Sequence, residues 1–358
     1  MLLTELFTPK AIAAHWNENP SNKIDYIGSV LFPPQKKASL DLKWFKGSNG
    51  LPVSLMPSAF DAKATFRDRP GLTMTETEMP FFREGFKVKE RDRQEILRVQ
   101  ESGDPYAQEI MARLFNDADQ LIAGAAVVPE RMIMQLLFPD SGNMGISFTA
   151  NGVAYTYNYD PAGAWKTSNY FAITTNPWTS PTTSDPFVDL KTAKDAIKEN
   201  TGEDATLAIM NSFTFGLLAQ SDAVKDRFLT TIGRSVGYIS DADVAQIVKD
   251  LLGIDIAVYD KRYKNESGVS AKFVPDYYVA LVPGDGTLGN TWYGTTPEEA
   301  DLRGGASNAQ VAIVNTGVAV TQIIDSHPVN VNTFASEIVL PSFERMDSCA
   351  LLKVGSST

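Results

Sequence analysis

The stretch DPYAQEIMARLFNDADQLIAGAAVVPERMIMQLLFP, residues 104–139, determines the main element of the fold. Asp104 suits a helix N-cap, and Pro105 suits the first helical position, where a backbone N–H has no helical partner in any case. Gly124 and Val128-Pro129 predict an interruption, after which PERMIMQLLFP resumes as a second helix. Apolar residues recur at helical spacing, which predicts a long amphipathic spine helix: Ile110, Leu114, Leu121, Ile122 and Ala125.

A charge-dense strip precedes this helix. Residues 61–101, DAKATFRDRPGLTMTETEMPFFREGFKVKERDRQEILRVQE, carry nine basic and nine acidic side chains. Alternation of threonines with Met74 and acidic residues, near Pro70-Gly71 and Met79-Pro80, predicts a long hairpin or an extended loop. The strip is either a solvated surface hairpin or a surface whose charges pair with a neighbouring subunit, where charge complementarity sets the register of contact.

The residues that follow the helix change from helical to strand periodicity. GISFTANGVAYTYNYD, residues 145–160, predicts two strands joined at Asn151-Gly152. The next stretch, rich in Pro, Thr and Ser and ending near Pro186, is predicted to be a connector although it holds Trp165, Tyr170 and Trp178. Residues 187–317 alternate helical and strand patterns, which indicates a mixed α/β module, and the remainder is β-rich.

Composition excludes several classes of protein. The chain has 358 residues, of which 43% are hydrophobic and 21% charged, so one large or two intertwined globular domains are expected. The net charge of −11 argues against general affinity for DNA phosphates. The N-terminal MLLTELFTPKAIAAHW lacks a secretion leader, and no apolar run is long enough for a membrane span, so we expect a cytosolic protein without membrane contact.

One glycine motif could bind a nucleotide. Residues 284–289, GDGTLG, match G-x-G-x-x-G and follow a predicted strand. Pro283 begins the turn, however, and Gly294 and Pro297 lie where a phosphate-binding helix would have to open. We therefore expect tight turns in an exposed loop, and a nucleotide-binding enzyme that uses Gly284–Gly289 stays as an alternative from another class.

Other candidates for chemistry have simpler structural explanations. The two histidines, His15 and His327, have no ligand partner at metal-binding spacing, and the sequence contains no G-x-S-x-G motif. The single Cys349 excludes an intramolecular disulfide and a Cys-based zinc site, and it suits a small packing residue. The carboxylate pairs lie where helices should begin, which suits the helix dipole: Glu298 with Glu299, and Asp241 with Asp243. We predict no catalytic, cofactor-binding or metal site.

The order of these segments resembles that of the lambda-type major capsid protein E family of tailed bacteriophages. The resemblance covers most of the chain and rests on the spine helix and on five blocks: ATFRDRPGL (64–72), MPFFREGFKVKERDRQEI (79–96), ERMIMQLL (130–137), GISFTANGVAYTYNYD (145–160) and FVPDYYVALVPGDGTLGNTWYGTTPEEADL (273–302). These are short apolar and charged blocks, with no catalytic string among them.

The resemblance implies an α+β Hong Kong 97-like capsid fold. Residues 1–45 would form an N-terminal arm, 46–98 an extended loop (β-hairpin), 99–186 and 318–358 a peripheral domain with the spine helix, and 187–317 an α/β axial domain at the capsomer centre. In such shells the extended loop lies over an adjacent subunit. Together with the density of charge, this makes seven residues candidates for inter-subunit contacts: Arg67, Arg69, Arg83, Glu84, Arg91, Asp92 and Arg93.

The implied function is structural. A major capsid (head) protein of this kind self-assembles through hexamers and pentamers into the icosahedral shell that encloses phage DNA, without a cofactor. Its expected partners are copies of itself, a separate scaffolding protein, a portal and optionally a decoration protein. Assembly is expected in the bacterial host cytoplasm and the final location in the virion capsid. A cellular encapsulin-like nanocompartment shell protein is an alternative, while a tail or adhesion protein would require repeats or a β-rich shaft.

Overall fold

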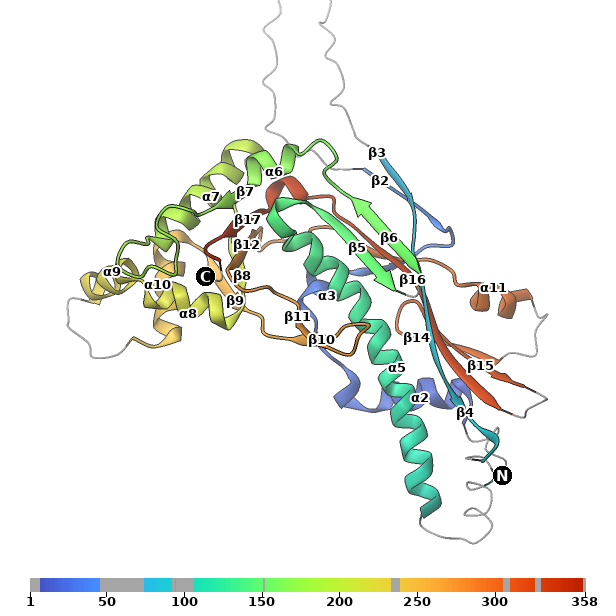
Figure 1. Ribbon diagram of the computed structural model, residues 1–358. Coiled ribbons are helices and arrows are strands. Elements are labelled where there is room, and N and C mark those ends of the chain that lie inside the picture. Colours follow the sequence, from blue (N-terminus) through green and yellow to red (C-terminus); the bar gives the residue numbers. More distant parts are fainter. Residues whose placement is uncertain are drawn as a thin grey trace, which may run out of the picture. The chain divides into compact units, whose positions relative to one another are not determined.

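The computed structural model describes residues 7–45, 74–91, 94, 106–150, 152–232, 239–304, 310–325 and 330–356. The chain divides into two compact units. Unit 1 comprises Met1–Lys43, Glu76–Met132 and Gly289–Ser342, and unit 2 comprises Trp44–Thr75, Ile133–Leu288 and Phe343–Thr358. Both units contain helices and strands, which confirms the predicted α+β class (Figure 1).

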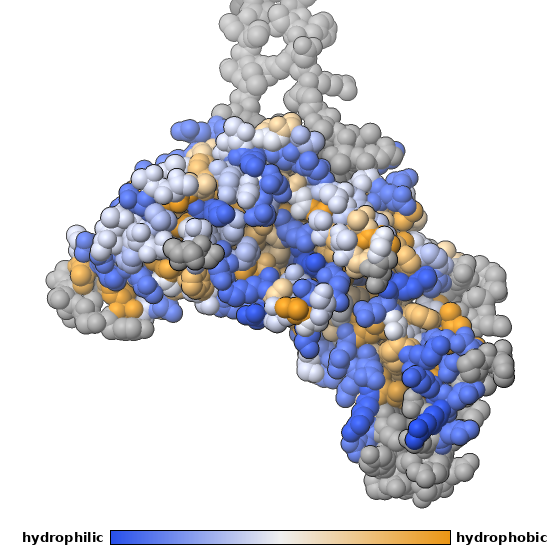
Figure 2. All heavy atoms as spheres, in the orientation of Figure 1, coloured by the Kyte–Doolittle hydropathy of each residue, from blue (hydrophilic) through white to orange (hydrophobic). Residues whose placement is uncertain are grey.

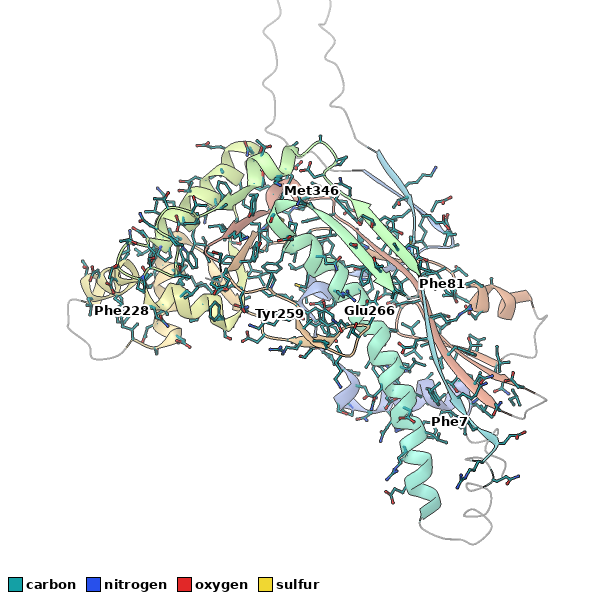
Figure 3. The ribbon with its side chains drawn as sticks, viewed as in Figure 1. Phe7, Phe81, Phe228, Tyr259, Glu266 and Met346 are labelled. Carbon is teal, nitrogen blue, oxygen red and sulfur yellow. The ribbon has the colours of Figure 1, made fainter. Side chains whose placement is uncertain are left out.

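Unit 1 is organised around one long strand, β16 (Val331–Ser342), whose residues are buried almost throughout. Its sheet has the order β1 (Pro34–Lys36), β13 (Asn290–Tyr293), β16, β15 (Val318–Ile324) and β14 (Gln310–Val314). A further strand, β4 (Phe81–Val88), pairs antiparallel with β16 from Phe81↔Ile338 to Val88↔Val331. Figure 1 shows β4 running along β16, and Figure 3 marks Phe81 at its start.

The N-terminal region adds helices to unit 1. Helix α2 (Pro9–Glu18) begins at the N-cap Thr8, whose side chain accepts a hydrogen bond from the Ala11 amide, and α3 spans Ile27–Leu31. The predicted extended arm is therefore partly helical. The reason is an apolar pair one helical turn apart, Ile12 and Trp16, which is buried with Phe7 (Figure 3) in a core shared with α5, β4 and the sheet.

The spine helix exists, but the predicted interruption is wrong. Helix α5 (Tyr106–Leu137) is continuous over 32 residues and contains Pro129. Proline inside a helix costs about 3 kcal/mol, because it removes a backbone hydrogen bond and crowds the preceding turn. Met132, Ile133 and Leu136 in the next turns are at most 1% exposed, and each such burial contributes roughly 1.5–3 kcal/mol. Tertiary packing therefore outweighs the local preference.

The charged strip forms strands on either side of Met79-Pro80, but these strands do not make a hairpin with each other. Strand β3 (Met74–Glu78) pairs with β2 (Asp41–Phe45), whereas β4 pairs with β16. Met79 is 2% exposed, and its amide donates to the Leu40 carbonyl at 3.0 Å. The dipeptide is therefore a buried crossing between two sheets, while Pro70-Gly71, the other position named for the predicted hairpin or extended loop, lies outside the described residues.

Unit 2 contains a five-stranded sheet in the order β7 (Tyr170–Ala172), β17 (Ala350–Lys353), β12 (Tyr278–Val282), β8 (Leu207–Met210) and β9 (Asp255–Val258). Its helices are α6 (Ala164–Asn169), α7 (Pro186–Thr201), α8 (Ser212–Gln220), α9 (Asp222–Ile232) and α10 (Asp241–Leu252). Two hairpins, β5 (Gly145–Ala150) with β6 (Val153–Asn158) and β10 (Arg262–Lys264) with β11 (Ser270–Lys272), complete it. The alternation of helix and strand predicted for this region is confirmed.

The predicted connector belongs to the core of unit 2 instead. Trp178 is fully buried among residues of α7, α8, α10 and the sheet, and its indole N–H donates to Asp189 at 2.8 Å. Trp165 is 3% exposed, and its indole N–H donates to the Met346 carbonyl at 2.8 Å. The two tryptophans therefore indicated the burial of this stretch better than its Pro, Thr and Ser content, which had suggested a connector.

Two glycines of unit 1 predict opposite effects of an added methyl group. A Cβ on Gly289 would lie 1.9 Å from the Ser342 carbonyl oxygen, whereas a Cβ on Gly124 of α5 would meet no atom within 4 Å. Gly289→Ala should lose about 1–3 kcal/mol of unfolding free energy, because backbone must move. Gly124→Ala should gain about 0.5–1 kcal/mol from helix propensity. Urea unfolding followed by circular dichroism tests both, and equal stabilities would contradict the β13–β16 geometry.

Candidate functional site

The glycine turn at 284–289 is a structural loop held by an arginine. The Arg345 guanidinium donates to the Asp285 carbonyl at 2.7 Å and pairs with Glu203 at 2.7 Å, while the Gly284 amide donates to Thr206 Oγ1 at 2.9 Å. The chain then enters strand β13, where a phosphate-binding turn would open into a helix N-terminus. The expectation of a structural turn is confirmed, and the basis for the nucleotide-binding alternative is lost.

The two carboxylate pairs have structural partners. Glu298, in the first turn of α11 (Pro297–Gly304), forms an ion pair with Arg83 and accepts from Ser336 Oγ at 3.1 Å. Glu299 is 6% exposed and pairs with Lys36 Nζ at 2.6 Å. At the start of α10, Asp243 completes a reciprocal cap with Ser240. The positions predicted as helix starts are confirmed.

The remaining candidates for chemistry also have ordinary surroundings. His15 Nδ1 lies 3.1 Å from Asp119 Oδ2, and the His15 ring stacks on Phe115. Cys349 is buried, and this burial raises the pKa of its thiol. His327 lies outside the described residues. Within the described ranges, no group of three or more His, Cys, Asp or Glu could hold a metal, and no helix is long and apolar enough to cross a membrane.

Three of the seven residues predicted to contact a neighbouring subunit are described by the structure. Arg83 forms the ion pair with Glu298 inside unit 1, and its guanidinium lies 4.7 Å from the centre of the Phe81 ring. Glu84 on β4 and Arg91 beyond it are exposed. The other four lie outside the described residues: Arg67, Arg69, Asp92 and Arg93. The Arg83–Glu298 pair joins positions 215 residues apart, so no local sequence signal could have identified it.

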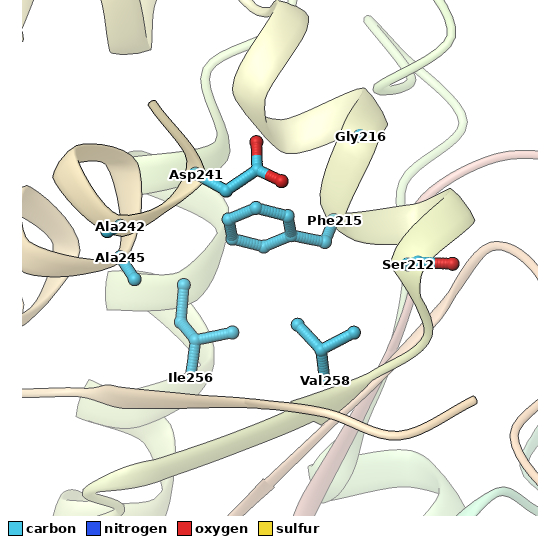
Figure 4. Close-up of a pocket in the computed structure, with 8 residues that line it drawn as sticks. All are labelled: Ser212, Phe215, Gly216, Asp241, Ala242, Ala245, Ile256 and Val258. Carbon is cyan, nitrogen blue, oxygen red and sulfur yellow. The ribbon is translucent and has the colours of Figure 1, made fainter. Parts of the chain in front are cut away.

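Unit 2 has an apolar groove that the sequence did not predict. It lies between α8, α10 and the edge strand β9, with a volume of about 420 Å³ (Figure 4). The Phe215 ring, Ile256 and Val258 lie along it, and Asp241 is the one carboxylate of its lining. Figure 2 shows apolar surface among hydrophilic residues in this part of the chain. The groove can accept apolar side chains.

A second feature that sequence analysis missed is a buried acid in β16. Glu337 is 2% exposed, and neither carboxylate oxygen has a hydrogen-bond partner in the described structure. Burial raises its pKa well above the usual range for a glutamate. The signal was present in the sequence as a single acid within the apolar run FASEIVLP, which the prediction treated only as a strand.

Comparison with solved structures defines the class of the fold. The chain is similar to the putative capsid protein of a prophage of E. coli CFT073, with a TM-score of 0.61 and 14% identity over 98% of this chain and 99% of that one. It is also similar to a phage-related protein from Bordetella bronchiseptica RB50, with a TM-score of 0.54 and 16% identity over 97% of each chain. No curated protein sequence matches it. The fold is the Hong Kong 97-like capsid fold.

The family follows from the sequence itself. The model of the phage major capsid protein E family matches residues 8–354, nearly the whole chain. The chain belongs to this family and is a major capsid shell protein, which places it in the virion capsid as one of many copies. The predicted family and fold are confirmed.

The contacts of Arg345 predict that replacing this residue lowers the stability of the folded chain. Arg345→Gln should lose about 1–3 kcal/mol of unfolding free energy, because it leaves Glu203 and the loop carbonyls of 284–288 without their charged donor. The matched control is Arg262→Gln, which removes an exposed arginine with one hydrogen bond to Ser270 and should change stability by less than about 0.5 kcal/mol. Urea denaturation measures both, and equal losses would contradict the role of Arg345.

Proposed function

We propose that this chain self-assembles through hexamers and pentamers into an icosahedral shell around phage DNA, as a structural subunit that catalyses no reaction. The observation that carries the proposal is the match of the phage major capsid protein E family over residues 8–354. The net charge of −11 supports enclosure of DNA without adhesion to its phosphates, since binding to phosphates needs clustered lysine and arginine.

The proposal also assigns each part of the chain to a part of the capsid subunit. Residues 1–45 act as the N-terminal arm, 46–98 as the extended loop, 99–186 with 318–358 as the peripheral domain, and 187–317 as the axial domain at the capsomer centre. The continuous helix α5 supports a spine in the peripheral domain. Strands β8, β9 and β12 with α8 to α10 and all but the first residue of α7 lie within residues 187–317, which supports an axial module, and β7 and β17, from residues assigned to the peripheral domain, complete its sheet.

Charged residues of the extended loop contact the adjacent subunit in this scheme. Arg83 has an ion-pair partner in its own subunit, so it contributes through its exposed part, which is 45% of the side chain. One exposed ion pair gives only about 0.2–1 kcal/mol. Closed rings repeat each contact, so modest contacts add up to a stable shell. The other loop residues assigned this role are Arg67, Arg69, Glu84, Arg91, Asp92 and Arg93.

The assembly needs further partners. A separate scaffolding protein, a portal and optionally a decoration protein complete the shell, and assembly takes place in the host cytoplasm. These partners follow from what a closed, DNA-filled head requires of a subunit that supplies only the wall.

Negative-stain electron microscopy with size-exclusion chromatography tests the function. The purified chain, expressed with and without its neighbouring genes, should form closed shells, rings of five or six, or tubes. A monomer or dimer in every preparation, especially one stabilised against heat by a nucleotide, would overturn the proposal. Particles filled with a protein cargo would favour a nanocompartment over a phage head.

Charge reversal in the extended loop tests the contact assignment. Arg67→Glu with Arg69→Glu should leave the subunit folded and soluble, because so charge-dense a strip favours a surface position and surface substitutions typically change stability by less than about 0.5 kcal/mol. The variant should reduce the yield of closed particles severalfold. The matched control reverses two exposed charges at the same spacing outside the loop, Arg262→Glu with Lys264→Glu. Unchanged particle yield for the loop variant refutes an interfacial role for the two arginines.

A further inference from the structure

Glu337 differs from the other buried glutamates of unit 1. Glu130 is 2% exposed and accepts a hydrogen bond from the Gly28 amide at 3.0 Å, and Glu299 pairs with Lys36. Glu337 is equally buried, yet both of its carboxylate oxygens have no hydrogen-bond partner within the described ranges. A buried polar group without a partner costs about 1–3 kcal/mol and calls for a functional explanation.

The register of the sheet defines what faces this carboxyl group. Phe82 of β4 is directly opposite Glu337, so the two side chains lie on one face of the sheet. Val339 lies on that face too, and Tyr293 of β13 pairs with it. Glu337 helps to raise the pKa of Tyr293, after the larger effect of that tyrosine's own burial. Tyr293 is therefore the titratable group that interacts with Glu337.

No described cation neutralises Glu337. Burial is the cause of its raised pKa. On β4, Glu84 lies two residues along the same face and is exposed, while Arg83 lies on the opposite face with Glu298 of α11. On α5, whose residues share a core with this sheet, Asp119 pairs with His15, Glu130 accepts a hydrogen bond from the Gly28 amide, and Arg113 pairs with Glu109. Arg131 of the same helix has interactions as well.

Strand β4 is the neighbour of Glu337 that pairs on one edge alone. Among the described strands it pairs with β16 alone, and Arg83, Glu84, Gly85 and Lys87 are exposed along it. On the other side of β16, β15 is held between β14 and β16 and is buried from Val318 to Gln322. Detachment of β4 breaks one ladder, whereas freeing β15 breaks two, so β4 is the strand whose release we take to expose Glu337.

We propose that Glu337 is a proton-controlled latch for β4: the neutral acid lets β4 stay paired with β16, and loss of its proton to water releases the strand. The latch is a property of the single subunit. Its consequence rests on the proposed function, because β4 is the C-terminal part of the extended loop assigned to residues 46–98. The protonation state of Glu337 would then control how firmly that loop is anchored before it contacts a neighbour.

The sign of the effect follows from linkage. In the closed form β4 is paired with β16, and in the open form β4 is released and Glu337 is exposed. Glu337 holds its proton more tightly in the closed form than in the open form, where its pKa is about 4.3. The neutral Glu337 therefore contributes its full stabilisation of the closed form below that ordinary pKa. This contribution is lost as the pH rises toward the raised pKa. Between the two values, the equilibrium constant for opening should increase about tenfold per pH unit.

Hydrogen exchange by mass spectrometry on the unassembled full-length chain tests this between pH 6 and 8.5. After correction for the intrinsic exchange rate, protection of peptides covering Phe81–Val88 should fall as pH rises, by up to about tenfold per pH unit between the two pKa values, and peptides covering β12 in unit 2 should show little change. Glu337→Gln, which keeps the shape without the charge, should abolish the slope. Glu84→Gln, the matched control on β4, should behave as the unmodified chain does.

Two outcomes overturn the latch. One is protection of β4 that does not change with pH in the unmodified chain, a result that needs no variant to fold. The other is a slope that persists in Glu337→Gln and disappears in Tyr293→Phe, which would assign the titration to the tyrosine. Because exchange is measured on the single subunit, these outcomes are independent of whether the chain forms shells, which electron microscopy decides separately.

Discussion

The pairing of β16 on both of its edges is the constraint on which unit 1 depends. Residues 331–338 bind β4 on one edge, while β15 pairs with residues 331–336 on the other, so strand segments about 250 positions apart in the chain must meet. Closing such a long loop costs entropy before any contact compensates for it. The compensation comes from burial along β16 and from the core that Phe7, Ile12 and Trp16 of the N-terminal region share with Val331. Neither end of the chain can form this core without the other.

Unit 2 depends on the C-terminal residues in the same way. Strand β17 lies between β7 and β12, and Arg345, just before it, holds the 284–288 loop against Glu203. Both units are therefore completed only by residues after 330. A fold with so many contacts between distant residues forms slowly, since non-local pairing must wait for loop closure. For a shell subunit this has a consequence: surfaces assembled from distant segments exist only on completed chains, so an incomplete chain lacks the surface on which assembly would depend.

Local sequence patterns predicted the helices and strands, but they could not predict the contacts between residues that are distant in the sequence. The periodicity of α7 and α10, the cap at Gly253 and the apolar run of β12 are local signals, and each was recognised. The predicted break at Pro129 was wrong because burial of the following turn is a tertiary effect. The Arg83–Glu298 pair, the groove beside Phe215 and the partnerless Glu337 depend on which strands become neighbours, and no alternation or spacing encodes that choice. The family resemblance supplied the fold, yet it could not supply these side-chain relations.

Strand β4 combines a single strand partner with a charged, exposed surface. A strand paired on one side exposes backbone donors and acceptors that invite pairing with another chain, and charged side chains are a common defence against wrong partners. Arg83, Glu84 and Lys87 are exposed on β4, and Arg83 is also held to its own subunit by Glu298. Such a strand is positioned by one ladder, and its release requires only that ladder to break. A buried acid opposite Phe82 adds a controlled cost to that one pairing without weakening the sheet on the other side of β16. Strand β4 can open by itself only if the rest of unit 1 stays folded. The buried strand β15 and the core around Ile122 supply the packing that keeps it folded.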